Sequence, residues 1–246
     1  RARTPDELRA AFGPRTRAVV VNSPHNPTGT VFTPEELGAI ADLCRRHDAV
    51  AVSDEVYERL TYRDDRPHRS ISTLPGMAER TVVISSVGKS FSLTGWKVGW
   101  AVAPPDLTKA VRSAHQFLAY AVATPLQHGA AVMLDSGEAY AARTAAHDHA
   151  MLRRLAPALS ELGFRVFEPE GAYFLMAEHA PVSERLGVRG DAAFCRWLTT
   201  RAGVAAIPPS AFYNDVEEGS RYVRFAFCKR QDTIDEAVRR LRAALA

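Results

Sequence analysis

The side chain with the most distinctive chemical context in the sequence is the amine of Lys89, which stands in the run Gly88-Lys89-Ser90. A run of this kind also ends the phosphate-binding loop of nucleotide-binding proteins. That loop requires another glycine five residues before the Gly-Lys pair, where this sequence has Val83. Residues 84–87 contain no glycine either. A nucleotide-phosphate role is therefore not indicated, and Lys89 is a candidate for a lysine that reacts.

Further polar side chains follow three apolar runs that are expected to be strands. Asn26 lies in the turn after the first run, Asp54 and Tyr57 follow the second, and Ser86 and Lys89 follow the third. Each alone also fits an ordinary role, such as a helix cap, a packed phenol or a solvated charge. Because ligands bind at the carboxyl ends of the strands of an open parallel sheet, the five together predict a functional site at that edge.

The elements that must position these side chains alternate between strand and helix, which is typical of βαβ units and a parallel sheet. A helix is predicted from Pro34 to His47, with Thr33 as N-cap, Pro34 at its first position and Glu36 completing a capping box. The other elements predicted in this half are strands over residues 17–24, 49–55, 80–86 and 98–104, and helices over 106–119 and 125–134.

The pattern changes after a long alanine-rich and charged segment, residues 138–162, which is predicted to be a helix that stops at Gly163. Short strands are then expected in "FRVFEP", "AYFLMAE", "GVAAIPP" and "RYVRFAFC", with helices near 191–202 and 232–245. We therefore predict two domains: an α/β domain over residues 1–147, with helices on both faces of a mainly parallel sheet, and a small α+β domain over 148–246.

The composition excludes several classes of function. Lys and Arg number 31 against 28 Asp and Glu, a net charge of +3, and the basic residues are scattered, so no nucleic-acid partner is expected. Three widely separated cysteines lack metal-ligand spacing, so no metal is expected, and buried thiols in a reducing cytoplasm are predicted. No apolar run is long enough to span a membrane, so no membrane partner is expected.

Four motifs together resemble one family: "NSPHNPTG", "SDEVY", "SSVGKSFSLTGWKVGW" and "VRFAFCK". They are similar to those of the fold-type-I aminotransferases, which use pyridoxal 5'-phosphate. The segments "GVAAIPPSAFY" and "VRFAFCKR" look most like those of the subgroup that contains kynurenine aminotransferase, glutamine transaminase and bacterial methionine aminotransferase. The resemblance implies the type I fold, amino-acid and 2-oxo-acid substrates, and a cytoplasmic homodimer with its active site at the subunit interface.

The resemblance also implies a role for each cofactor-facing residue. Lys89 would form a Schiff base with the cofactor aldehyde and then carry the proton from the substrate Cα, tasks that need the neutral amine favoured by burial beside other cations. Asp54 would pair with the pyridinium nitrogen and keep it protonated. Tyr57 and Asn26 would hydrogen-bond the 3'-oxygen of the ring.

Four further assignments come from the same resemblance. Ser86 and Lys97 would bind the phosphate, although many relatives carry arginine at the position of Lys97, and a lysine lacks the bidentate fork. Thr124 matches a position that reaches the phosphate in the neighbouring subunit. Arg224, with Asn26, would clamp the α-carboxylate of the substrate; without the resemblance, an arginine facing water from an edge strand is equally compatible with the sequence.

Two alternatives stay open at this point: a β-lyase acting on cysteine conjugates through the same imine, and the effector-sensing domain of a transcription regulator. Family members also carry a long segment before the asparagine motif, with a glycine-containing phosphate turn and a ring-stacking aromatic residue, and this sequence has none of it. We therefore expect a longer parent chain, and expect residues 1–246 alone to be poorly soluble and to hold the cofactor weakly.

Overall fold

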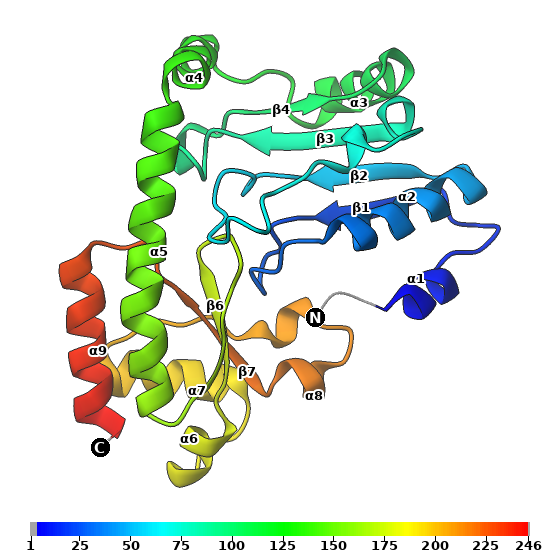
Figure 1. Cartoon of the computed structure of the whole chain (residues 1–246). Helices are drawn as coiled ribbons and strands as arrows, with labels where there is room; N and C mark the ends of the chain where they lie inside the picture. The colour runs from blue at the N-terminus through cyan, green and yellow to red at the C-terminus, as the bar shows by residue number, and fades with distance from the viewer. Residues whose placement is uncertain (1–3, 246) are drawn as a thin grey trace. The chain divides into compact units, whose positions relative to one another are not determined.

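The computed structural model describes residues 4–245, which divide into two compact units (Figure 1). The first unit extends to Ala145, except for Asn26–Gly29. The second unit consists of Asn26–Gly29 together with the chain from Ala146 onward. Four residues of the asparagine motif thus belong to the unit built mainly from the C-terminal part of the sequence.

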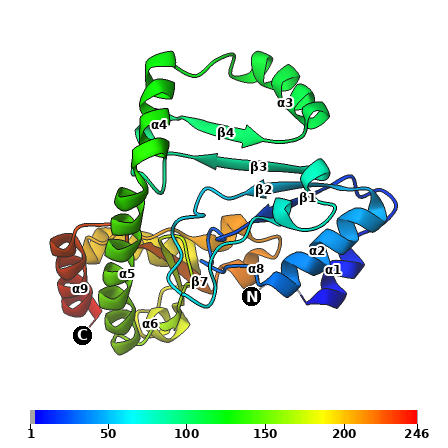
Figure 2. The same ribbon diagram turned by 45° about the horizontal axis from the view of Figure 1, so that its top comes forward.

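The first unit is built on a four-stranded sheet, whose strands follow one another in the order of the sequence (Figure 2). β1 (Ala18–Asn22), β2 (Val50–Asp54) and β3 (Thr81–Ser86) are parallel, as predicted. β4 (Gly99–Val102) is antiparallel to β3. The segment between β3 and β4 contains only the 3-10 turn η3 (Thr94–Trp96), and without a crossover helix the chain runs back beside β3.

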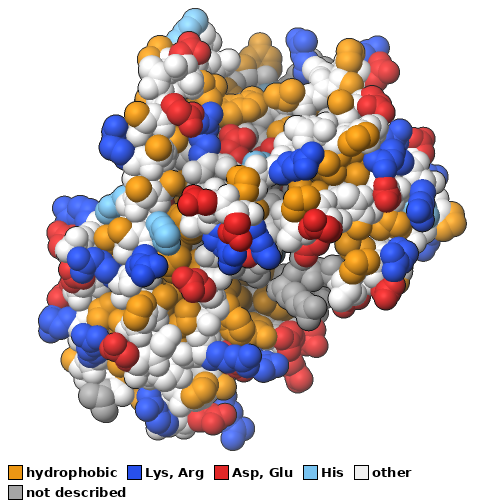
Figure 3. Space-filling model, in the orientation of Figure 1, with side chains coloured by type: hydrophobic (Ala, Val, Ile, Leu, Met, Phe, Trp, Pro, Cys, Tyr) orange, Lys and Arg blue, Asp and Glu red, His pale blue; other side chains and the backbone are white. Residues whose placement is uncertain are grey.

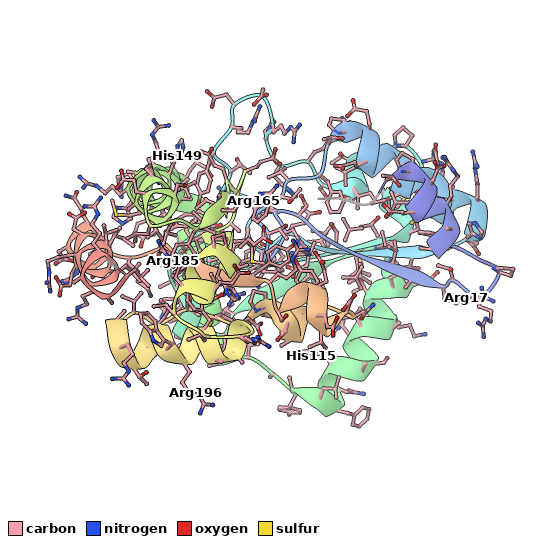
Figure 4. All side chains as sticks on the ribbon, turned by 90° about the horizontal axis from the view of Figure 1, so that it is seen from below. Arg17, His115, His149, Arg165, Arg185 and Arg196 are labelled. Carbon is pink, nitrogen blue, oxygen red and sulfur yellow. The ribbon has the colours of Figure 1, made fainter. Side chains whose placement is uncertain are left out.

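Helices lie on both sides of this sheet: α1 (Pro5–Ala11) and α2 (Pro34–His47) on one side and α3 (Pro105–Leu118) on the other (Figure 4). The prediction for α2 is confirmed, because Thr33 and Glu36 form the capping box and Pro34 opens the helix. The remaining helical elements of this unit are α4 (Thr124–Ser136), η1 (Ile71–Thr73) and η2 (Ala78–Arg80).

The two faces of the sheet differ in how they are covered. On one face Val21 and Ala51 pack against α2 through Leu37, Ile40 and Cys44. On the other face Val20 is 73% exposed and Ile84 39%. Because successive side chains of a strand point to opposite faces, this second face also carries Asp54 and Ser86, and it opens onto the candidate site.

The second unit is an antiparallel sheet of three strands with helices around it. α5 (Glu138–Glu161) begins in the first unit and continues into the second, and Gly163 follows it with φ +96°, as the predicted stop requires. The strands are β5 (Arg165–Phe167), β6 (Phe174–Glu178) and β7 (Tyr222–Ala226), in that order in the sheet. The helical elements are α6 (Ala180–Arg185), α7 (Asp191–Trp197), η4 (Leu198–Ala202), η5 (Pro209–Phe212), α8 (Val216–Gly219) and α9 (Gln231–Leu245).

The predicted strand in "GVAAIPP" is wrong. Only Ile207 of this segment pairs with the sheet, through an isolated antiparallel bridge to Arg224. Pro208 and Pro209 follow it at once and start the 3-10 turn η5. Proline has no N–H to donate to a ladder and its φ is fixed, so pairing stops after one residue.

The core of the second unit combines α5 with aromatic rings from the sheet and α7. Leu152, Leu155 and Leu159 of α5 are each at most 3% exposed. The ring of Phe164 lies 5.9 Å, centroid to centroid, from those of Phe194 and Phe225. This packing fixes β7, which carries Arg224.

The surface shows no concentration of one sign of charge on the face in Figure 3, where acidic and basic side chains are interspersed. Among the described residues, no helix combines the length and the apolar character needed to cross a membrane.

Asp148 of α5 is a buried carboxylate, 3% exposed, and burial raises its pKa to about 6, only partly offset by the nearby His147. The folded state therefore favours the protonated acid, and the free energy of unfolding falls as pH rises from about 4 to about 6. Above about pH 6, the raised pKa of Asp148 lowers the free energy of unfolding by about 3 kcal/mol.

We expect Asp148→Asn to raise the free energy of unfolding at about pH 7.5 by up to that 3 kcal/mol, and by about half as much at pH 5. Urea unfolding of the parent and the variant at both pH values measures the difference. Arg153→Ala, at an exposed position of the same helix, is the control and leaves the pH trend in place. A variant less stable than the parent at both pH values would show that the ionised carboxylate stabilises the fold.

Candidate active site

The candidate site lies where β2 and β3 of the first unit end. Asp54 is the last residue of β2, Ser86 is the last of β3, and Lys89 follows three residues later. The three side chains line an open depression of about 1000 Å³, together with Lys97. An amine, a carboxylate and a hydroxyl therefore meet at the carboxyl edge of the sheet, as their positions after the strands predicted, and Lys97 adds a second cation.

Lys97 reaches this edge because β4 runs antiparallel to β3. Gly99 pairs with Ser86, and Lys97 lies two residues before it in a left-handed conformation, φ +56°. A Cβ at position 99 would come within 2.8 Å of the Ser85 carbonyl oxygen, so glycine allows the two strands to approach there. Ser86 Oγ accepts the Gly88 N–H at 3.2 Å, which leaves its own proton for another acceptor.

Asp54 is held by its neighbours on both sides. Its Oδ1 accepts the N–H of Val56 at 3.2 Å, and its carbonyl oxygen accepts the N–H of Ser23 at 3.2 Å and Asn22 Nδ2 at 3.1 Å. Tyr57 lies in the turn that follows and is 3% exposed. Lys89 Nζ lies 5.8 Å from the centroid of the Tyr57 ring, so these two predicted residues are close together.

The second unit brings Asn26 and Arg224 together although 198 positions separate them in the sequence. Arg224 Nη1 donates to Asn26 Oδ1 at 2.7 Å. The guanidinium carbon lies 4.2 Å from the ring centroid of Phe174 and 5.1 Å from that of Phe212. Arg224 pairs with Met176 on one side and bridges to Ile207 on the other, so its backbone is fixed from both sides.

The turn that carries Asn26 is fixed to the second unit through Gly29. The Gly29 carbonyl oxygen accepts the N–H groups of Glu170 at 2.9 Å and Gly171 at 2.8 Å. Gly29 has φ +71°, and a Cβ there would lie 2.3 Å from that of Pro169. Only glycine fits both the conformation and the space, which explains the glycine that ends the asparagine motif.

The structure thus places the predicted residues in two groups, one in each unit. Asp54, Tyr57, Ser86, Lys89 and Lys97 form the group in the first unit, and Asn26 and Arg224 form the group in the second. Thr124 begins α4 and is exposed; the depression is instead lined by Val122, two residues earlier.

Two further features lie beside the predicted residues and were not predicted from the sequence. Phe212, 51% exposed, lies against Arg224. Its position in the family-like segment "GVAAIPPSAFY" was the sequence signal that could have indicated it. His115 of α3, labelled in Figure 4, lines the depression together with Arg112. A helix that supplies polar side chains to a sheet edge leaves no motif in the sequence, because its position depends on packing.

The residues of the first group fit pyridoxal phosphate by their chemistry. The cofactor needs an amine for its aldehyde, a carboxylate for its ring nitrogen, and cationic and hydroxyl donors for its phosphate. Lys89, Asp54, Lys97 and Ser86 supply these groups, and all four line the same depression.

Comparison with known proteins agrees with this chemistry. The model of the family "Aminotransferase class I and II" matches residues 4–241. The chain is 45% identical over 244 residues to the probable N-succinyldiaminopimelate aminotransferase DapC of Mycobacterium tuberculosis, covering 96% of this chain and 60% of the relative. It is 38% identical over 247 residues to kynurenine–oxoglutarate transaminase 3 of Rattus norvegicus, covering 95% of this chain and 54% of that relative.

Solved structures match over nearly the whole chain. N-succinyldiaminopimelate aminotransferase from Mycobacterium tuberculosis gives a TM-score of 0.93 at 45% identity, covering 100% of this chain and 62% of the other. YbdL from Escherichia coli, for which a methionine aminotransferase function was identified, gives a TM-score of 0.90 at 35% identity. This match covers 98% of this chain and 62% of YbdL. These matches confirm the predicted type I fold.

The curated relatives are longer than this chain, which spans 60% of DapC and 54% of the rat transaminase. Kynurenine and methionine aminotransferases were both expected from the motifs, whereas the similarity to DapC was not. Members of this family depend on pyridoxal 5'-phosphate, so the predicted cofactor is also confirmed for the family. The chain belongs to the class I and II aminotransferases.

Proposed function

We propose that the protein is a pyridoxal-phosphate-dependent aminotransferase, which moves an amino group from an amino acid to a 2-oxo acid. The observation that carries this proposal is the depression at the ends of β2 and β3, lined by Asp54, Ser86, Lys89 and Lys97. Family membership agrees with it. The activity remains a proposal for the whole protein, since the relatives extend well beyond the part that matches.

In this proposal the residues of the first unit bind the cofactor and move one proton. Ser86 and Lys97 bind the phosphate, Asp54 pairs with the ring nitrogen, and Tyr57 hydrogen-bonds the ring oxygen. Bound pyridoxal phosphate supplies the electron sink for the substrate. Lys89 anchors the cofactor and carries the proton that leaves the substrate Cα, a task for which a positioned amine is suited.

The residues of the second unit are proposed to bind the substrate carboxylate. Arg224 offers a guanidinium that is oriented by Asn26 and by two aromatic rings. A guanidinium fixed in this way matches a carboxylate with two parallel hydrogen bonds. Asn26 contributes its amide both to the carboxylate and to the ring oxygen of the cofactor.

We further propose a cytoplasmic homodimer with the active site at the subunit interface and Thr124 directed to the cofactor phosphate of the second subunit. Large apolar side chains support an interface, because Phe117, Leu118 and Tyr120 are each at least 84% exposed at the end of α3 and just after it. Cys44 and Cys195 are buried as predicted, whereas Cys228 is only partly buried; the two buried free thiols support a reducing compartment.

The test is a two-step assay on the purified full-length protein with pyridoxal phosphate. An amino acid alone is expected to change the visible absorbance of the cofactor, and a 2-oxo acid is expected to restore it. The panel begins with N-succinyldiaminopimelate, kynurenine and methionine, the compounds in the relatives' names. Release of pyruvate and ammonia from cysteine conjugates, with no transfer to any 2-oxo acid, would contradict the proposal and indicate a β-lyase.

A further inference from the structure

A buried hydrogen-bonded network lies on the face of the sheet opposite to the candidate site. Asp54 faces the depression, so its neighbours Ser53 and Glu55 point to the other face. Both are 2% exposed. The charged and hydroxyl side chains around them come from β3, from the turn that carries Glu58 and from the loop of residues 61–70, for which no role was predicted.

Both carboxylate oxygens of Glu55 are occupied by donors from the protein. Oε1 accepts Ser53 Oγ at 2.7 Å and Ser70 Oγ at 2.6 Å. Oε2 lies 2.9 Å from Nε2 of His68, whose side chain is 10% exposed. Burial raises the pKa of Glu55, but the hydrogen bonds from His68, Ser70 and Ser53 outweigh it and bring the pKa below its ordinary value. The carboxylate is therefore ionised, and His68 Nε2 carries the proton of their shared hydrogen bond.

This network fixes the backbone that carries Asp54 and Tyr57. The N–H of Glu55 donates to the carbonyl oxygen of Ile84 at 2.8 Å, and the carbonyl oxygen of Glu55 accepts the N–H of Glu58 at 2.8 Å. The second bond closes the turn that holds Tyr57. Glu58 Oε1 in turn accepts Ser85 Oγ at 3.1 Å, which connects the turn to the residue before Ser86.

We propose that His68 is a positioning residue, which holds Asp54 and Tyr57 in place through its hydrogen bond to the buried carboxylate of Glu55. Glu55 directly follows Asp54 and lies two residues before Tyr57, so a change at His68 is expected to move the edge of the site without a direct contact to it. The expected effect of His68 on cofactor binding rests on the proposed function. Its effect on the backbone does not depend on that function.

A metal site formed by Glu55, Glu58 and His68 explains this cluster less well than a hydrogen-bonded network does. Glu55, Glu58 and His68 have potential ligand atoms within 4.8 Å of one another. Glu55, however, already has three protein donors, and Glu58 accepts from Ser85. Hydrogen bonds within the protein occupy both carboxylate oxygens of Glu55 and one of Glu58, which favours a positioning role for the cluster.

The test compares His68→Ala and His68→Gln with the parent in the full-length protein. Hydrogen exchange, measured without cofactor, is expected to accelerate in residues 54–60 of His68→Ala and to stay at the parental rate in α2. The dissociation constant for pyridoxal phosphate is expected to rise about 10-fold or more, by analogy with the loss of about 10- to 100-fold seen when an outer partner of a metal ligand is removed. His68→Gln, whose amide can donate to Glu55, is expected to recover most of both properties.

Arg69→Ala is the matched control, since Arg69 is the exposed neighbour in the same loop. Parental exchange in residues 54–60 of His68→Ala would overturn the proposal. So would faster exchange spread equally over α2 with no recovery in His68→Gln, because that pattern indicates only general destabilisation. If the parent itself binds no pyridoxal phosphate, the proposed function fails, while the exchange comparison still decides the role of His68.

Discussion

Replacing Lys89 with alanine is expected to abolish amino transfer in the full-length protein. The variant loses the amine that anchors the cofactor and the group that moves the substrate proton. General acid–base catalysis by a positioned side chain is worth about 10²–10⁴-fold, and loss of the covalent step adds to this. We therefore expect kcat to fall by at least about 10⁴-fold, measured as consumption of the amino donor with a saturating 2-oxo acid.

Borohydride reduction and peptide mapping give an independent measurement on the parent. The reduced cofactor is expected on the peptide that contains Lys89, and no such label is expected in Lys89→Ala. Lys109→Ala removes an exposed amine of α3 and serves as the control with parental turnover. A label on Lys97 or Lys109, or a Lys89→Ala variant with parental kcat, would show that the reactive lysine is assigned wrongly.

Local sequence patterns were sufficient where the decisive interactions are also local. The start of α2 depends on Thr33, Pro34 and Glu36, which lie within four positions, and the helix begins where they predict. The end of α5 depends on one glycine with positive φ. The convergence of Asp54, Ser86 and Lys89 followed from strand order alone, because parallel strands bring their carboxyl ends to one edge.

Features that depend on tertiary packing were not accessible from the sequence. The antiparallel direction of β4 brings Lys97 toward Ser86, but an apolar run does not encode the direction of its strand. The prediction for "GVAAIPP" is a different case: the two prolines that limit pairing to Ile207 are visible in the sequence, and their lack of N–H donors argued against a strand. The network of Glu55 was missed because His68 and Ser70 lie in an irregular loop, where no periodicity marks a side chain as buried.

The role of Arg224 is the second prediction with a large expected effect. Its guanidinium is already oriented by Asn26 and two aromatic rings, so the parent loses little entropy when it binds a carboxylate. Truncating one partner of a hydrogen-bonded charge pair costs roughly 3–5 kcal/mol, much of it from the charge left unpaired. We expect Arg224→Ala to lower kcat/KM for amino acids by at least about 100-fold.

Two further variants make this result specific to the guanidinium. Arg224→Lys keeps the charge but not the fork, so we expect an intermediate loss. Arg221→Ala, on the same segment, removes an arginine that pairs with Glu178 at 2.7 Å and is 51% exposed; an exposed pair contributes little, so kcat/KM should stay near the parental value. The cofactor absorbance should persist in all three variants, because the groups proposed to hold the cofactor in the first unit are unchanged. Parental kcat/KM in Arg224→Ala, with the absorbance intact, would place the substrate carboxylate elsewhere and leave Arg224 as a structural partner of Asn26.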